Sequence, residues 1–215
     1  MSWSKHRGGP PGRRGYHHGN LREALIQGAL GLIAEKGPAG FTIADAARLA
    51  GVSPAAPYRH FRDRDDLMAD VARRGFEEFA VRLRTAWNEG KPDPMRAFEA
   101  IGRAYLAFAR EEPAFYAAMF EAGTPHDRTP ELRLAADAAF DVLRKASEVL
   151  SATLPEGKRP PALMMALHVW ALSHGIASLF GRTEGRKTPM SPEDLLEAGV
   201  LVYLQGLGIS GPAPK

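Results

Sequence analysis

Residues Phe41 to Leu67 read FTIADAARLAGVSPAAPYRHFRDRDDL, and this stretch decides the fold. It predicts two short helices joined by a tight turn, followed at once by the start of a third helix. Thr42 precedes the first helical run and can cap it. Gly51 follows that run, where a left-handed C-cap favours a residue without a Cβ. Because a helix-turn-helix places its second helix in the DNA major groove, the stretch predicts a DNA-reading element.

The second of these helices carries the side chains expected to face DNA. Ser53 is a favourable N-cap, and Pro54 at the first helical position loses no hydrogen bond. Pro57 lacks the N–H that a helix uses at its fourth position, so we expect a slightly distorted first turn. The alternative is a pair of ordinary amphipathic helices in an all-α core. The expected DNA contacts of this module are Ser53, Pro54, Ala55, Ala56, Tyr58, Arg59 and His60, with Thr42, Ser53 and Arg64 on phosphates.

From Tyr16 the chain reads YHHGNLREALIQGALGLIAEKGPAGFTIADAARLAGVSPAAPYRHFRDRDDL, which resembles the N-terminal domain of a TetR/AcrR-type transcriptional regulator. The pieces fall in the family's order, from the Glu35-Lys36-Gly37 stop to the Tyr58-Arg59-His60-Phe61 run. Pro57 replaces the family's usual aliphatic residue. An Arg64-Asp65 pair stands where the family usually has Lys before an acidic residue. The resemblance implies that the protein binds double-stranded DNA.

A second resemblance lies far downstream, in the segment Trp170-Ala-Leu-Ser-His174-Gly175. It is similar to the Trp-x-x-x-His-Gly signature of a subgroup of C-terminal effector domains in the same family. Together the two resemblances imply an all-α fold of about nine helices. Three of them form the helix-turn-helix domain, and the others form a domain that binds a small-molecule effector and dimerises.

Charge is distributed unevenly along the 215 residues. Residues 1–64 hold ten Lys and Arg against four Asp and Glu, a net of +6, and residues 65–215 have a net of −3. A basic N-terminal module on a mildly acidic body fits phosphate binding by one end, although such a charge also serves solubility. In the basic arm, Arg13, Arg14 and Tyr16 are expected to reach the minor groove.

Composition bounds the remaining possibilities. There are no cysteines, so disulfides and thiolate metal sites are excluded. No apolar run approaches the length expected of a transmembrane helix, and no apolar core follows the basic N-terminus. We therefore expect a cytoplasmic protein without membrane contact. The predicted domains are a disordered basic arm, a helix-turn-helix domain, an effector-binding and dimerisation domain and a flexible tail, at 1–19, 20–66, 67–208 and 209–215.

The last two helices are expected to form the dimer interface. The helix from Ala162 to Gly181 is apolar on more than one side, so one face can pack on its own subunit and another on a partner. The alternative is a thick monomeric core. A small-molecule cavity is expected between this helix and the fifth helix. Its candidate residues are Tyr105, Phe108, Phe115, Tyr116, Met119, Phe120, Met164, His168, Trp170 and His174.

The alternative to a DNA-binding regulator, from a different functional class, is an enzyme. Residues 181–188 resemble a phosphate loop, but Lys does not directly follow the second Gly, as a Walker A motif requires. His17 and His18 lack nearby carboxylates, and His168 and His174 fall on different sides of a helix. No catalytic constellation, metal site or cofactor is therefore expected. We expect a ligand-responsive DNA-binding regulator, most simply a repressor released from a palindromic operator, with a constitutive DNA-binding protein as its rival.

Overall fold

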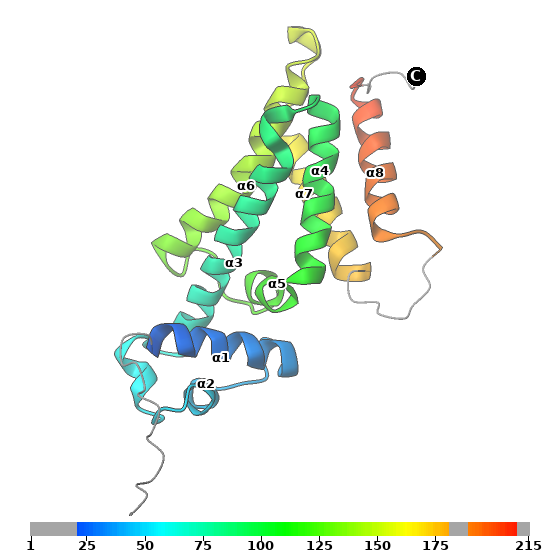
Figure 1. Ribbon diagram of the computed structural model, residues 1–215. Helices are drawn as coiled ribbons and strands as arrows, with labels where there is room; N and C mark the ends of the chain where they lie inside the picture. Colours follow the sequence, from blue (N-terminus) through cyan, green and yellow to red (C-terminus); the bar gives the residue numbers. More distant parts are fainter. Residues whose placement is uncertain (1–20, 181–188, 210–215) are drawn as a thin grey trace, which may run out of the picture.

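The computed structural model describes residues 21–180 and 189–209. Within these ranges it has eight α-helices, three short 3₁₀ helices and no strand, so the expected all-α fold is confirmed (Figure 1). The α-helices are α1 (Leu21–Lys36), α2 (Ile43–Leu49), α3 (Arg64–Trp87), α4 (Pro94–Glu111), α5 (Pro113–Phe120), α6 (Pro130–Ser151), α7 (Ala162–Phe180) and α8 (Pro192–Gly206). The 3₁₀ helices are η1 (Ala56–Arg59), η2 (Asn88–Gly90) and η3 (Glu156–Lys158).

Helix α3 connects the two parts of the molecule. Its first turns pack against α1, and the rest of it packs against α4, α5 and α6 in an upright bundle. Figure 1 shows α1 and α2 lying across one end of this bundle, with α8 on its outer edge. Asp63 caps α3 by accepting a hydrogen bond from the Asp66 amide at 2.8 Å. Because α3 is continuous from Arg64, a single helix joins the small module to the body.

Prolines begin four of the helices. Pro94, Pro113, Pro130 and Pro192 each occupy the first helical position, where a missing N–H costs nothing. In α4, α6 and α8 the residue before the proline is Asp93, Thr129 or Ser191, and its side chain accepts a hydrogen bond from the third helical amide. These four prolines therefore mark helix starts.

The third helix of the DNA module differs from its prediction. Residues 54–55 form a turn, and only η1 is helical, with Ala55 as an N-cap that makes no side-chain hydrogen bond. Pro57 cannot donate to the Ser53 carbonyl, and the Ala56 amide bonds that carbonyl at 3.0 Å instead. Pro57 therefore tightens the element into a 3₁₀ helix, and Ser53 does not cap an α-helix. This difference accounts for eight α-helices where about nine were expected.

The C-terminal end of the body gives one further correction. Ile209 falls in the predicted flexible tail, but its side chain is buried and only 3% of the residue is exposed. Ile209 N bonds the Leu204 carbonyl at 2.9 Å, so the chain folds back onto the end of α8. The basic arm and residues 210–215 lie outside the described residues.

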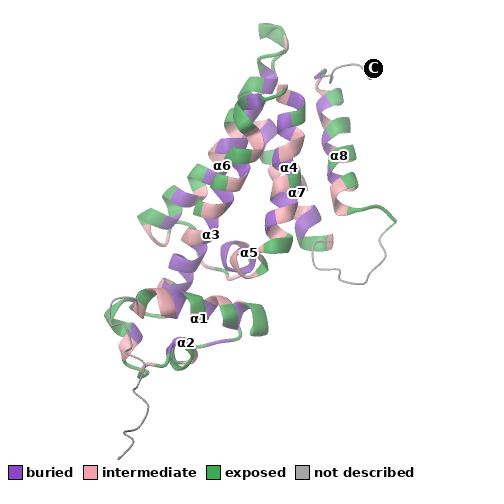
Figure 2. Ribbon diagram, in the orientation of Figure 1, coloured by how far each residue is buried: buried purple, intermediate pink, exposed green. Residues whose placement is uncertain are grey.

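Helix α7 also departs from expectation. It has the length and apolar composition of a membrane-spanning helix, which the sequence was not expected to contain, and one third of that span is buried within the protein. Leu163, Leu167, Trp170 and His174 fall on one predicted side of this helix, but the structure does not bury them equally. Trp170 and His174 pack on aromatic rings of α5, while Leu163 and Leu167 on the same stripe are about half exposed. The two parts of this helix face therefore differ in burial. Figure 2 shows the neighbouring helix α8 drawn as exposed along much of its length.

Candidate DNA-binding surface and effector cavity

The start of α2 is held by a reciprocal cap. The Thr42 hydroxyl accepts a hydrogen bond from the Asp45 amide at 3.2 Å, and the Asp45 carboxylate accepts one from the Thr42 amide at 2.8 Å. The bond from the Thr42 amide holds the pKa of Asp45 below its usual value. The predicted cap is therefore present. The Thr42 hydroxyl also donates to the Asp45 carboxylate at 2.8 Å, so Asp45 engages both donors of Thr42, and a phosphate contact by Thr42 remains a prediction.

Beyond the turn at Gly51, the chain presents a short exposed surface. Gly51 has a φ of 69°, the left-handed conformation expected at this position. Pro57 points inward and is buried, whereas the Tyr58 residue is 59% exposed. Of the side chains expected to read DNA, Ser53, Pro54, Ala55, Tyr58, Arg59 and His60 are exposed and Ala56 is half-buried. The local chain thus brings these residues together on the outside of η1.

Arg64 has a different position from the one expected. Its Nε donates to the Phe41 carbonyl at 3.0 Å, and a terminal nitrogen donates to the Pro38 carbonyl. The guanidinium also lies 4.8 Å from the centre of the Phe41 ring. These contacts tie the start of α3 to the loop between α1 and α2. Arg64 therefore acts inside the module, and its phosphate contact remains a prediction.

Charged side chains also join α1 to α3. Asp70, which is buried, accepts hydrogen bonds from Arg22 Nε at 2.9 Å and from Arg73 Nε and Nη2 at 3.0 and 2.8 Å. Arg74 pairs with Glu23 at 2.5 Å. These bonds and the apolar core fix the module on the first turns of α3.

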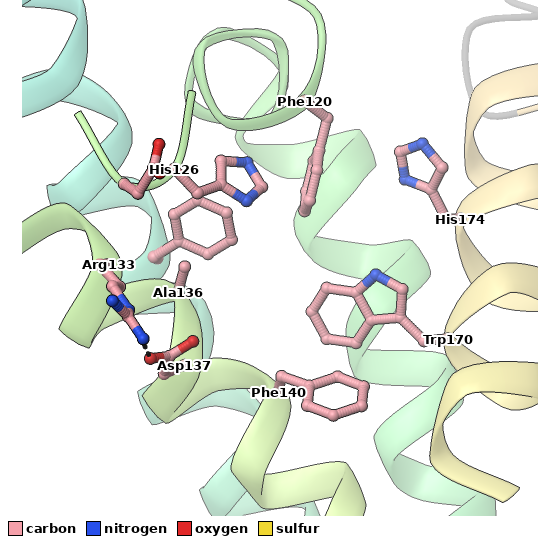
Figure 3. Close-up of a pocket in the computed structure, with 10 residues that line it drawn as sticks. Phe120, His126, Arg133, Ala136, Asp137, Phe140, Trp170 and His174 are labelled. Atoms are coloured by element: carbon pink, nitrogen blue, oxygen red, sulfur yellow. Dashed lines mark ion pairs between the residues drawn. The ribbon is translucent and has the colours of Figure 1, made fainter. Parts of the chain in front are cut away.

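A cavity of about 570 Å³ opens in the body beside the middle of α3. Figure 3 shows aromatic side chains facing each other across it, with Arg133 and Asp137 at one side. Its volume is within the range of small-molecule sites, and apolar walls with a few polar groups are their usual composition. The lining residues are Phe76, Phe120, His126, Asp127, Arg133, Ala136, Asp137, Phe140, Trp170 and His174.

Ring contacts fix the walls of the cavity. Phe120 lies edge-on to Phe76 with ring centres 5.4 Å apart, and Trp170 lies edge-on to Phe140 at 5.5 Å. Phe120 and Trp170 meet at 6.3 Å and close one side. Edge-to-face pairs of this kind add stability beyond the area they bury. The cavity is thus largely preformed by α3, α5, α6 and α7.

The comparisons with known proteins follow this division of the molecule. Residues 25–71 match the model described as bacterial regulatory proteins of the tetR family, and residues 98–203 match the tetracyclin repressor-like C-terminal domain. The chain belongs to the TetR family. It is a DNA-binding transcriptional regulator by that membership, and the resemblance read from its sequence is confirmed at family level. Membership of the Trp-x-x-x-His-Gly subgroup remains a prediction.

Solved structures share the fold of this TetR-family chain. A protein of unknown function from Rhodococcus sp. RHA1 is 29% identical, with a TM-score of 0.73, covering 90% of this chain and 98% of that chain. The TetR-family regulator PfmR from Thermus thermophilus is 21% identical, with a TM-score of 0.63, covering 84% and 97%. AibR, solved with isovaleryl coenzyme A and operator DNA, is 19% identical, with a TM-score of 0.63, covering 85% and 97%. The sequence matches none of the curated proteins compared with it.

Three of the ten predicted ligand residues line the cavity of this TetR-family protein: Phe120, Trp170 and His174. Tyr105 and Tyr116 lie behind it, with their hydroxyls 3.1 and 2.9 Å from His174 Nδ1. The structure places the other five away from the lining. Phe108 packs on Phe79 in the core, and His168 bonds the Tyr203 hydroxyl of α8 at 3.1 Å. Met119 is buried, while Phe115 and Met164 are half-buried.

Burial sets the charge of His174, and the tyrosine pair sets its tautomer. Burial lowers the pKa of His174, so the imidazole is neutral near pH 7. Burial also raises the pKa of Tyr105 far above its usual range, so this hydroxyl keeps its proton. Two tyrosine hydroxyls beside Nδ1 favour the tautomer with the proton on Nε2. His174 is therefore a neutral, hydrogen-bonded side chain of the cavity wall near pH 7.

The other seven lining residues were not predicted. Phe76 and Phe140 have the pattern of core positions on long helices, and the rest come from the loop after α5 or from the polar side of α6. Helical spacing places Arg133, Ala136, Asp137 and Phe140 on neighbouring positions of one α6 face, which is the signal available from sequence. His126 and Asp127 carry no such signal, because their position depends on how residues 121–129 cross from α5 to α6.

Proposed function

We propose that this protein is a ligand-responsive repressor, which binds a palindromic operator as a homodimer and leaves it when a small molecule occupies the cavity. The observation that carries the proposal is the position of that cavity. Its wall includes Phe76 of α3, the helix whose first turn holds the DNA module. A ligand can shift the equilibrium between DNA-binding and free conformations only if it prefers one of them. A ligand in a cavity walled by α3 contacts the helix that holds the DNA module, so its affinity can differ between the two conformations.

Exposed apolar side chains on α7 and α8 support the homodimer. Leu179 is 72% exposed and Val202 is 69% exposed, on the two helices that form the outer edge of the body. Large contiguous apolar patches on soluble proteins usually mark interaction sites. A second copy covering α7 and α8 would also explain why α7 is apolar enough to resemble a membrane span. The exposed large apolar residues on these two helices are Leu163, Leu167, Leu179, Leu201 and Val202.

In this proposal the exposed surface around η1 contacts the major groove. Tyr58, Arg59 and His60 contact bases and the backbone, and Ser53 contacts a phosphate. Two copies must place these surfaces about 34 Å apart, or a multiple of that, to meet half-sites on one side of the duplex. Arg13, Arg14 and Tyr16 lie outside the described residues, and their reach into the minor groove is part of the proposal. Deleting residues 1–15 should weaken operator binding, and unchanged affinity would show a passive arm.

Ligand chemistry follows from the lining. Four aromatic rings in the lining, those of Phe76, Phe120, Phe140 and Trp170, favour a bulky apolar or aromatic body. Asp127 and Asp137 against Arg133 leave the charged side chains of the lining with one net negative charge. This balance favours neutral or cationic compounds over anions. Family membership, together with this binding cavity, leads us to infer a regulator and not an enzyme, acting in the cytoplasm.

The test uses a neutral aromatic probe, N-phenyl-1-naphthylamine, whose fluorescence rises in apolar surroundings. The full-length protein should bind it, and Phe140→Ala should weaken that binding while the protein stays folded. If the probe weakens operator binding, thermodynamic linkage requires that operator DNA weaken probe binding by the same factor. That factor is about 5–150-fold in typical cases. Equal probe affinity with and without operator would favour the rival view, a constitutive DNA-binding protein.

A further inference from the structure

We propose that Arg128 is the positioning residue that transmits occupancy of the cavity to the DNA module. The inference rests on the proposed function and names the contact through which it works. Arg128 belongs to the loop between α5 and α6, far from the DNA module in sequence. Its guanidinium nevertheless holds the first turn of α3.

One side chain bridges two carboxylates. Arg128 Nη2 donates to both oxygens of Asp63, at 2.9 and 2.8 Å, and to Asp66 Oδ1 at 3.0 Å, and Nε reaches Asp66 Oδ1 at 3.2 Å. The Arg128 side chain is 25% exposed and that of Asp66 is 13% exposed. A planar fork of donors suits such a bridge, which a lysine would not reproduce. We call these contacts the Arg128 clasp.

The clasp begins at the wall of the cavity. His126 and Asp127 line the cavity and immediately precede Arg128 in the chain. The His126 ring lies edge-on to Phe76 at 5.1 Å, and its Nε2 is 3.0 Å from the Met119 carbonyl. In Figure 3 His126 stands between the cavity and the backbone of this loop. A ligand that displaces His126 therefore acts two residues from the guanidinium that holds α3.

The clasp ends beside the DNA-reading surface. Asp66 also accepts hydrogen bonds from Arg62, at 2.6 Å from Nε and 2.9 Å from Nη2. Arg62 follows Phe61, a buried residue that anchors the end of the η1 segment in the core. His60 of the exposed surface is thus three residues from Asp63. Moving Arg128 changes the support of both the α3 cap and the segment that ends η1.

The clasp is separate from the contacts that hold the module on α3. Those contacts run through Asp70, which binds Arg22 of α1 and Arg73 of α3. Asp63 also caps α3 without Arg128, because its bond to the Asp66 amide is local. Loss of the clasp should therefore leave the helices folded. The orientation of the DNA module should then no longer depend on whether the cavity is occupied.

The experiment replaces the unknown ligand by a substitution that fills the cavity. The Ala136 side chain points toward the cavity in Figure 3, so Ala136→Trp places a ring where a ligand would lie. Operator affinity of the full-length protein is measured with and without this substitution in three backgrounds: wild type, Arg128→Ala and Arg144→Ala. Loss of N-phenyl-1-naphthylamine binding checks that the cavity is filled. Arg144→Ala is the control, since Arg144 of α6 pairs with Asp141 and Glu148 of its own helix.

Filling the cavity should weaken operator binding about 10-fold or more wherever Arg128 is intact, in the wild type and in the Arg144→Ala control alike. In the Arg128→Ala background the same filling should change affinity by less than about 3-fold, because the change is no longer transmitted. Arg128→Lys should behave like Arg128→Ala. Hydrogen exchange of residues 56–70 gives a second readout, which should respond to filling only when Arg128 is present.

The outcomes separate the two proposals. If filling weakens operator binding equally with and without Arg128, the clasp is not the transmitting contact, and ligand control stands. If filling leaves wild-type operator binding and exchange unchanged, ligand control through this cavity fails and the clasp fails with it. If Ala136→Trp does not fold, Ala136→Phe takes its place under the same criteria.

Discussion

Replacing Asp70 by Asn tests how the DNA module is held on the body. The substitution keeps the size of the side chain and removes its charge, so no cavity contributes to the result. Asp70 is only 6% exposed and accepts three hydrogen bonds from two arginines, at 2.8–3.0 Å. With Asn, one oxygen position becomes an NH₂ group that faces a guanidinium, so donor meets donor.

The magnitude follows from these contacts. Hydrogen bonds to charged groups contribute about 1.5–3 kcal/mol and neutral ones about 0.5–1.5 kcal/mol. One bond is lost and two are weakened by roughly 1 kcal/mol each, but the Arg22 side chain is 54% exposed and regains water. We therefore expect Asp70→Asn to lower the free energy of unfolding by about 2–3 kcal/mol.

The cost should depend on pH. Burial alone raises the pKa of Asp70, but hydrogen bonds from Arg22 and Arg73 outweigh it, so the folded pKa lies below the usual 3.8. A group with a lowered folded pKa stabilises the protein above its unfolded pKa, and this stability is lost as pH falls through the folded pKa. The difference between wild type and Asp70→Asn should be complete at pH 7 and shrink below about pH 4.

Urea unfolding followed by circular dichroism measures these differences. The control is Asp137→Asn, because that side chain is 69% exposed and lies 3.7 Å from Arg133. An exposed pair of this kind contributes little, so the control should stay within about 0.5 kcal/mol of wild type. If Asp70→Asn is no more destabilising than Asp137→Asn at pH 7, the buried charge network does not hold the module.

Arg64, Asp66 and Leu167 each have contacts or exposure that a single substitution tests. Arg64→Ala should lower the free energy of unfolding, measured by urea titration, by about 1–2 kcal/mol, because two hydrogen bonds to carbonyls and the contact with the Phe41 ring are lost. If the substitution changes only the salt dependence of DNA binding, Arg64 contacts a phosphate instead. Hydrogen bonds, first from Arg62 and also from Arg128, hold the pKa of Asp66 at about 2. Asp66→Asn should therefore reduce the loss of unfolding free energy that the wild type shows as pH falls from about 4 to 2, and an unchanged dependence of stability on pH would argue against this role of Asp66. Leu167→Glu should convert dimers to monomers in analytical ultracentrifugation, whereas Leu134→Glu on α6 should not; equal behaviour would move the interface elsewhere.

The sequence predicts those parts of the fold that depend on neighbours in the chain. Thr42 caps α2, Gly51 takes a positive φ, and α3 begins at Arg64, within the stretch predicted to end in the start of a helix. Each of these features is decided by residues a few positions apart. Pro57 predicts a distortion, but its effect is larger than expected, because the early helix has no other bond with which to keep α-helical geometry.

The cavity depends on packing between helices, and the sequence predicts it only in part. Phe120, Trp170 and His174 are aromatic or polar groups on apolar helices, and they line it. Tyr105 and Phe108 have the same local character, but the rotation of α4 buries them behind the wall. Arg128 has the local character of any residue in a polar loop. Its contact with Asp63 joins positions 65 residues apart, which no local pattern indicates.

The central claim is that this protein reads a DNA sequence through the exposed surface around η1. Fluorescence anisotropy at about 150 mM salt should compare full-length protein on the duplex upstream of its own gene with a shuffled duplex of the same composition. We predict a preference of about 1,000-fold or more for the upstream duplex, in line with specific DNA-binding proteins. Tyr58→Ala should reduce that preference. Equal affinity for both duplexes at that salt concentration would contradict the claim.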